Sequence, residues 1–266
     1  MNRRLTVGLA AAVVIAVAVA VVVYHPTRPG TIHLRFNAVM GKQALVFNEP
    51  VYANPGGRGM FQVRDFLMYL SNIQLVGATG TYAVPDSYYL ARFDNPSTSY
   101  DIVIGSVPRD SYSRVILSIG LDEKANASLA PTGDLDPNGR MAWNWEVGYK
   151  FVLFEGALLV DGETVPLVYH VGFNENRRTF QFDLADPESL WSPQGLGFSV
   201  NLLALFTGKR TVDMQALSNV KFDRADAGML ANNYATMISL GTAALRSDGL
   251  RLLLPAVTPR RAVLPS

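Results

Sequence analysis

Short stretches of alternating apolar and polar residues, separated by turn residues, run through most of the chain and restrict it to a fold made of β-strands. Residues 32–38 alternate with the period of a strand that buries one face. Residues 149–173 predict a β-hairpin, because apolar stretches flank Asp161 and Gly162, a dipeptide typical of tight hairpin turns. Further strands are expected at residues 73–77, 88–93, 101–107, 113–121, 179–184 and 197–206.

Helical patterns are few. Residues 64–70 are compatible with one or two helical turns, and residues 225–240, which a glycine follows, form the best candidate for a helix. Many short strands with turns between them predict an all-β domain over residues 31–252, either a β-sandwich or a Greek-key barrel with a short C-terminal helix. The Pro-rich residues 253–266 are expected to be a loosely held tail.

An uncharged segment at the N-terminus indicates export. Residues 5–24 are mostly Ala and Val and follow Arg3 and Arg4. As a helix they would be about 30 Å long, the thickness of the hydrocarbon core of a bilayer. The arginines favour a cytoplasmic N-terminus, which predicts a membrane-anchored domain on the periplasmic side, with residues 1–30 as anchor and linker. The alternative is a cleaved signal peptide and a periplasmic or secreted protein, since residues 16–18 resemble a cleavage site.

Composition excludes several classes of function. The chain of 266 residues has no cysteine, so it has no disulfide, thiolate metal site or cysteine nucleophile. Its formal net charge is +1 and it has no basic stripe, which argues against binding nucleic acid. It also lacks the G-x-S-x-G, glycine-rich phosphate loop and H-E-x-x-H patterns. We therefore expect a protein that is not an enzyme.

A polar stretch near the middle of the chain allows two interpretations. Asp134, Asp136 and Asn138 match the opening of a calcium-binding EF-hand loop, but the twelfth position of that loop is a tryptophan instead of an acid. The other interpretation is a tight turn in which these side chains bond to their own backbone, and we prefer it. Calcium is accordingly the less favoured cofactor.

Two tryptophans and a histidine follow. Trp143 and Trp145 lie two residues apart, so in a strand both would point to one face. Core packing is one interpretation, and an exposed aromatic pair that is redox-active or adjacent to a metal is the other. His170 lies in a strand pattern on the face opposite Tyr169 and Val171. It is either a hydrogen-bonded structural residue or one imidazole ligand of a metal.

Several segments, in this order, resemble the MbnP-like family of exported, copper- and methanobactin-associated proteins. The most specific are residues 119–137 (IGLDEKANASLAPTGDLDP) and 141–156 (MAWNWEVGYKFVLFEG), which are similar to the family's "G-x-L-D-P…W-x-W-N-S-G-Y-x-F-x-x-L-E-G" core. Weaker matches are residues 34–45 (LRFNAVMGKQAL), 61–75 (FQVRDFLMYLSNIQL), 169–172 (YHVG) and 230–237 (LANNYATM). The resemblance extends over most of the domain.

The resemblance implies a periplasmic or surface β-sandwich that works with a di-haem, cytochrome c peroxidase-like partner. That partner would oxidise a tryptophan toward kynurenine, and the product would bind copper together with histidines. In this chain Trp143 or Trp145 is then the residue for oxidation, His170 is a copper ligand, and His33 is a possible second ligand. The chain departs from the family at Asn37, where relatives often have histidine just after the opening phenylalanine, and at residues 146–149. The alternative function is a binding or scaffold module at the membrane surface that is metal-free or calcium-stabilised.

Overall fold

The first strand forms where the alternation predicts it. The computed structural model describes residues 28–94, 97–128, 133–144 and 147–241. In β1 (Gly30–Met40), Ile32, Leu34 and Phe36 are fully buried, whereas Arg35 is exposed. This strand pairs in parallel with β13 (Leu196–Asn201) and antiparallel with β7 (Ser99–Val107) and β2 (Gln43–Ala44). With β15 (Ile238–Leu240) added beside β13, the described residues form a five-stranded sheet.

A second, ten-stranded sheet in the described chain is organised around one long strand, β4 (Met60–Gly77). Its main path is β12 (Arg178–Asp183), β8 (Tyr112–Ile119), β4, β10 (Gly148–Val160), β11 (Glu163–Gly172) and β14 (Asn219–Val220). Three short strands, β3 (Tyr52–Ala53), β5 (Gly80–Ala83) and β6 (Tyr88–Phe93), also pair with β4. The short strand β9 (Ala142–Asn144) pairs with β10.

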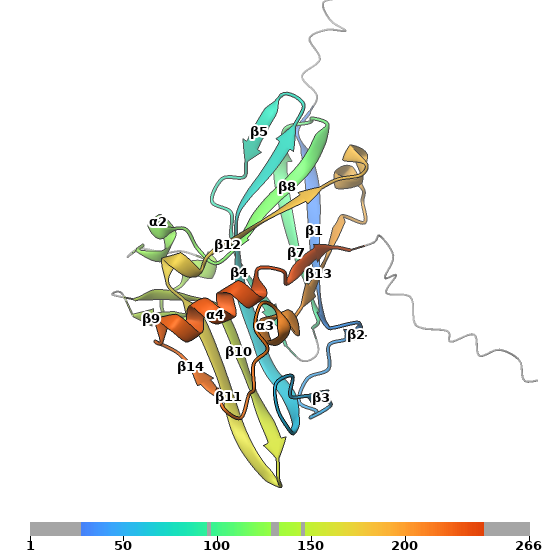
Figure 1. Cartoon of the computed structure of the whole chain (residues 1–266). Coiled ribbons are helices and arrows are strands. Elements are labelled where there is room, and N and C mark those ends of the chain that lie inside the picture. The colour runs from blue at the N-terminus through green and yellow to red at the C-terminus, as the bar shows by residue number, and fades with distance from the viewer. Residues whose placement is uncertain (1–27, 95–96, 129–132, 145–146, 242–266) are drawn as a thin grey trace, which may run out of the picture.

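The two sheets pack face to face around a shared apolar core (Figure 1). This confirms the predicted all-β domain and agrees with the sandwich, one of its two predicted forms. Phe182 of the larger sheet meets Phe198 of the smaller one edge-on, with ring centroids 5.0 Å apart, and Phe36 stacks on Phe198. A second, smaller core lies on the outer face of the larger sheet. It is formed by Leu67, Tyr69, Leu90, Leu121, Ala125, Met141, Tyr149, Phe151 and Leu153.

The helices of the described residues are short. They are α2 (Glu123–Asn126), α3 (Ala204–Thr207) and α4 (Arg224–Tyr234), with 3-10 turns η1 (Gly133–Leu135), η2 (Asn174–Asn176) and η3 (Pro187–Trp191). The helix α4 begins after Asp223, whose side chain accepts a hydrogen bond from the backbone N–H of Asp226. It packs against α3 and β11 (Figure 1). The predicted helix over residues 225–240 is right in its first part only, because residues 238–240 form β15.

The hairpin is confirmed. Val160 pairs with Glu163, and Asp161 and Gly162 both have positive φ, 53° and 83°, as a type I′ turn requires. Residues 197–206 form a strand only as far as Asn201, and α3 follows.

The helical turns expected over residues 64–70 are wrong, because this segment belongs to β4. Leu67 and Tyr69 face the second core while Phe66 and Met68 face the first. A strand that is buried on both faces has a continuous apolar pattern, which is not distinguishable from that of a helix by period alone.

The predicted anchor, residues 5–24, and the predicted tail, residues 253–266, lie outside the described residues. No helix in the described part of the chain is long and apolar enough to cross a membrane.

Candidate functional site

Trp143 lies on the outer face of the larger sheet, in a cluster of aromatic rings. The strand β9 that carries it pairs with β10. Its ring covers Gly172 of β11, where a Cβ atom would come within 2.5 Å of Trp143 Cζ3. Phe173 and Phe222 flank the indole, with ring centroids 5.3 and 5.1 Å away. Trp145, the other tryptophan of the motif, lies outside the described residues.

His170 lies on the same outer face of β11. Its neighbours Tyr169 and Val171 point into the main core, as the alternation predicts, and its own side chain is 11% exposed. Because side chains two residues apart in a strand share a face about 6.6 Å apart, His170 is next to Gly172 and the indole that covers it. The structure therefore brings together two of the predicted site residues, Trp143 and His170.

Glu155 of β10 orients the imidazole. Its Oε1 is 3.0 Å from Nε2 of His170. Burial lowers the pKa of His170, and the charge of Lys150 lowers it further, although the hydrogen bond to Glu155 opposes both effects. The imidazole is therefore neutral at pH 7. In the tautomer that donates from Nε2–H to the carboxylate, the lone pair is on Nδ1.

Two carboxylates and two guanidinium groups form a charge network beside this pair. Arg64 donates to Glu155 at 2.6 Å, and Arg140 donates to Glu155 at 3.0 Å and to Asp65 at 3.2 Å. Burial alone would raise the pKa of Glu155, but hydrogen bonds from Arg64 and His170 hold it below its ordinary value. Asp65 is held below its ordinary pKa in the same way, with Arg140 and Arg64 as its donors. Both carboxylates are therefore ionised at neutral pH.

Lys150 lies between the strand pair β10–β11 and the segment that carries Trp143. It is buried, it pairs with Gly172 across the ladder, and its Nζ lies 5.9 Å from the centre of the Trp143 ring. The ammonium group donates to the backbone carbonyls of Arg140 and Ala142, the latter at 3.2 Å. Burial lowers the pKa of Lys150. These bonds fix the segment that carries Trp143 onto the sheet.

The sequence did not reveal Glu155, Asp65, Arg140 or Lys150 as site residues. A register shift in the ladder between Lys150 and Val152, at Phe151, changes which residues of β10 face outward. A simple alternation therefore does not place Lys150 and Glu155 on one face. Lys150 and Glu155 do fall within the 141–156 motif, and the resemblance of that motif to the family was the sequence feature that pointed to them.

His33 is not near this cluster. It lies on β1 in the smaller sheet, and its neighbours Ile32 and Leu34 are fully buried in the core. Its side chain therefore points away from the core on the outer face of that sheet, whereas His170 is on the outer face of the other sheet. With the core between them, the two predicted metal ligands His33 and His170 do not coordinate one ion within a single chain.

The acidic stretch forms the predicted tight turn at Asp136 and Asn138, whereas the side chain of Asp134 bonds to β6 outside the turn. Asp136 Oδ1 accepts hydrogen bonds from the backbone N–H and the side-chain amide of Asn138, at 2.9 and 3.0 Å. Asp134 Oδ2 accepts from the backbone N–H of Leu90 at 2.8 Å, and its carbonyl accepts from the hydroxyl of Tyr69. These oxygens stabilise the turn and the contact with β6, which favours the turn over the calcium loop.

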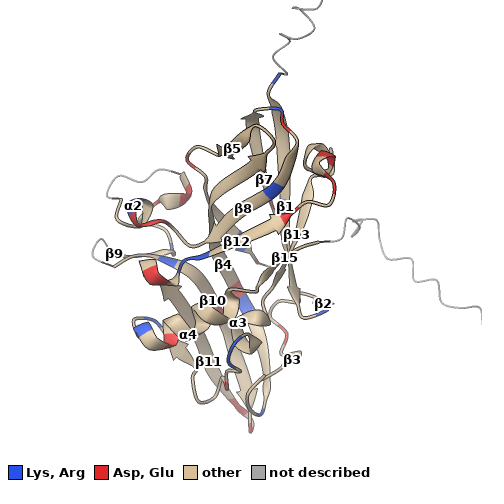
Figure 2. Ribbon diagram, turned by 45° about the horizontal axis from the view of Figure 1, so that its top comes forward, with Lys and Arg blue, Asp and Glu red and all other residues tan. Residues whose placement is uncertain are grey.

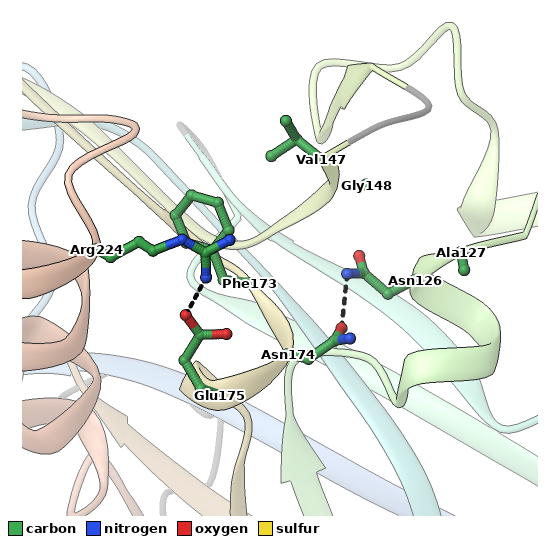
Figure 3. Close-up of a pocket in the computed structure, with 8 residues that line it drawn as sticks. All are labelled: Asn126, Ala127, Val147, Gly148, Phe173, Asn174, Glu175 and Arg224. Atoms are coloured by element: carbon green, nitrogen blue, oxygen red, sulfur yellow. Dashed lines mark hydrogen bonds and ion pairs between the residues drawn. The ribbon is translucent and has the colours of Figure 1, made fainter.

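A small cavity adjoins the aromatic cluster. It has a volume of about 230 Å³ and is lined by Asn126, Ala127, Val147, Gly148, Phe173, Asn174, Glu175 and Arg224 (Figure 3). The guanidinium of Arg224 lies 4.2 Å from the centre of the Phe173 ring and is ion-paired with Glu175. Phe173 has a φ of 72°, an unusual conformation for a bulky residue. In the described chain, no group of three or more His, Asp or Glu residues is arranged to hold a metal ion.

Fold and site define a two-sheet β protein with a histidine–carboxylate pair beside a stacked tryptophan. The model of the MbnP family matches residues 29–227, and the chain belongs to that family. Among solved structures, it is similar to MbnP from Methylosinus trichosporium, with a TM-score of 0.56 and 19% identity, over 82% of this chain and 100% of that one. No curated protein matches. Membership of this family suggests a copper- and methanobactin-associated accessory protein.

Proposed function

We propose that this protein is an exported accessory protein that binds copper at His170, beside Trp143, and is the target of a periplasmic di-haem enzyme. The observation that carries the proposal is the Glu155–His170 pair next to the stacked indole. A histidine that binds a metal usually donates its other N–H to a carboxylate, which fixes the tautomer and the ring orientation. Here Glu155 would hold Nε2–H and leave Nδ1 for the metal.

The donor chemistry fits copper in part. Imidazole nitrogen is a good copper ligand. The two nearest carboxylates, Glu155 and Asp65, are engaged by Arg64 and Arg140, so they are poor candidates for direct ligands. A second nitrogen would come from the aromatic amine of a kynurenine. The peroxidase-like partner, with peroxide as the oxidant, would cleave the C2–C3 bond of the indole of Trp143 or Trp145, and hydrolysis would release the C2 carbon as formate. Bound copper would supply one-electron redox chemistry, and the chain itself supplies the oriented imidazole.

The position of Trp143 supports oxidation by a partner protein. The indole is half-buried, and the ring that flanks it, Phe222, is 60% exposed. A haem enzyme docked on this face would be separated from Trp143 by one aromatic ring. The N-terminal segment, residues 5–24, would direct the domain to the periplasmic side of the membrane, either as an anchor or as a cleaved signal.

The second candidate is a metal-free binding module at the membrane surface. One observation favours it: Arg64 and Arg140 already neutralise the carboxylates beside His170. His170 and Glu155 would then be a structural pair, and the cavity beside Phe173 would be the binding feature. A calcium-stabilised form of this module is less supported, because Asp136 and Asn138 bond to each other.

The test is co-expression of the full chain with a di-haem partner enzyme, followed by peptide mass spectrometry and copper analysis. The proposal expects an oxidised tryptophan in the peptide spanning residues 141–150 and copper that co-purifies. Trp143→Phe and Trp145→Phe identify the modified residue, and Trp191→Phe is the matched control, because Trp191 packs on Arg109 and Tyr112 elsewhere in the fold.

His170→Gln should abolish copper retention without changing the fold. If both tryptophans stay intact in the presence of the active partner and no copper is retained, the copper proposal is refuted and the metal-free module is the better conclusion.

A further inference from the structure

A second hollow in the surface is lined by cations. It lies between the chain after α3 and one side of α4, along most of that helix, and has a volume of about 350 Å³. Its charged lining is Lys209, Arg210 and Arg224, and the other lining residues are Ala225, Gly228, Met229 and Asn232. None of these residues is acidic. Basic segments of the ribbon lie at one end of α4 and beside α3 (Figure 2).

Two of the three cations have no ion-pair partner among the described residues. In the part of the chain that the structure describes, neither Lys209 nor Arg210 takes part in an ion pair. Arg224 pairs with Glu175, which is itself half exposed. The like charges of Lys209 and Arg210 beside one hollow repel each other, and a bound anion would relieve that repulsion.

The backbone beneath these cations is fixed in place. Asn233 of α4 is fully buried, its Oδ1 accepts from the N–H of Arg210 at 2.8 Å, and its Nδ2 donates to the carbonyl of Arg210 at 2.7 Å. A Cβ atom on Gly208 would be 2.5 Å from the Cα atom of Asn233, so the loop packs directly on the helix. A ligand therefore does not have to order this loop, which lowers the cost of binding.

Asn232 adds a neutral donor. Its Oδ1 accepts a hydrogen bond from Arg178 at 2.9 Å, which leaves the side-chain NH₂ group as a donor at the edge of the hollow. The hollow thus offers as donors the guanidinium group of Arg210, the ammonium group of Lys209 and the side-chain NH₂ group of Asn232. Arg224 lines the same hollow, but its guanidinium group is bound to Glu175.

We propose that this hollow binds a compact oxyanion, namely inorganic phosphate or the phosphate group of a monoester. The planar guanidinium group matches the geometry of phosphate oxygens and bonds two of them at once, while the ammonium group contributes a point charge. The volume accommodates phosphate with a small substituent. The site is separate from His170 and requires no metal, so it stands or falls independently of the copper proposal.

Isothermal titration of the full chain in metal-free, low-salt buffer tests this site. The probes are inorganic phosphate and glycerol 3-phosphate. The expected result is saturable binding that weakens with added salt. The double variant Lys209→Gln, Arg210→Gln should bind roughly tenfold more weakly or worse, because it loses charged hydrogen-bond donors. A matched control is the double variant Lys42→Gln, Lys124→Gln, which removes two exposed charges elsewhere.

The control should bind phosphate as the unmodified chain does, and both double variants should keep the same urea unfolding midpoint. Tighter binding of inorganic phosphate would identify the free ion as the ligand, and tighter binding of glycerol 3-phosphate would identify a phosphorylated molecule. The proposal is overturned if neither probe gives saturable heat, or if both double variants lose binding equally, since the effect would then come from net charge.

Discussion

Replacing Glu155 by Gln tests the charge network at the candidate site. The carboxylate accepts hydrogen bonds from His170, Arg64 and Arg140. The bond from His170 lies between side chains that are 11% and 17% exposed, so the charge on its acceptor contributes about 1–2 kcal/mol. Both arginines are about half exposed, so each ion pair adds only about 0.2–1 kcal/mol. We expect the variant to lose about 2 kcal/mol at pH 7.

The size of this loss of stability depends on pH, and the direction of the dependence follows from the pKa of Glu155. The folded protein holds the pKa of Glu155 below its ordinary value. The Glu155 carboxylate therefore stabilises the fold fully above the pKa that Glu155 has in the unfolded chain. This stabilisation disappears as the pH falls through the lower pKa that Glu155 has in the folded protein. The pKa of His170 is also lowered, so protonation of the imidazole below its ordinary pKa opposes folding as well. The difference between the two proteins should shrink below about pH 4.

The assay is urea unfolding at pH 7 and at pH 3.5, with Glu163→Gln as the matched control because Glu163 is exposed and lies on the same hairpin. A loss of 2 kcal/mol corresponds to a fall in Tm of about 4–8 °C for a domain of this size. If Glu155→Gln leaves stability at pH 7 unchanged, or if its effect is the same at both pH values, the proposed network does not stabilise the fold.

Three further changes probe the site and its surroundings. Gly172→Ala should lower the free energy of unfolding by about 1–3 kcal/mol and alter tryptophan fluorescence, because the new methyl group displaces the overlying indole. Gly197→Ala should change neither the free energy of unfolding nor the fluorescence, because a Cβ atom there meets nothing within 4 Å. His170→Gln should weaken copper binding at least about tenfold in equilibrium dialysis while His33→Gln leaves it unchanged, and equal losses would contradict the separation of the two histidines. Asp134→Ala should lower the free energy of unfolding by about 1–3 kcal/mol, by the same amount in calcium and in EDTA. A loss that depends on calcium would restore the calcium interpretation.

The sequence predicted those parts of the fold whose pattern comes from one buried face. The alternation in β1 and at His170 correctly placed the buried faces of two strands, and the Asp161-Gly162 turn placed the hairpin. The pattern predicted an all-β domain but did not decide between a sandwich and a barrel. The pattern did not predict the strand at residues 64–70 of β4, because Leu67 faces a second core that the local sequence does not indicate. The ion-paired residues around His170 come from three separate segments, so only the folded chain shows that Arg140 reaches Glu155.

The parallel pairing of β1 with β13 has a consequence for how the chain is made. Leu34 pairs with Leu196, so the first strand of the domain waits for a partner that is synthesised more than 150 residues later. Until β13 has been synthesised, the edge of β1 that pairs with it has no partner strand. Contacts between residues so distant in sequence slow folding, because a long loop must close before they form. A nascent chain that stops before residue 196 cannot complete its smaller sheet, so the sandwich closes only after nearly all of it has been synthesised.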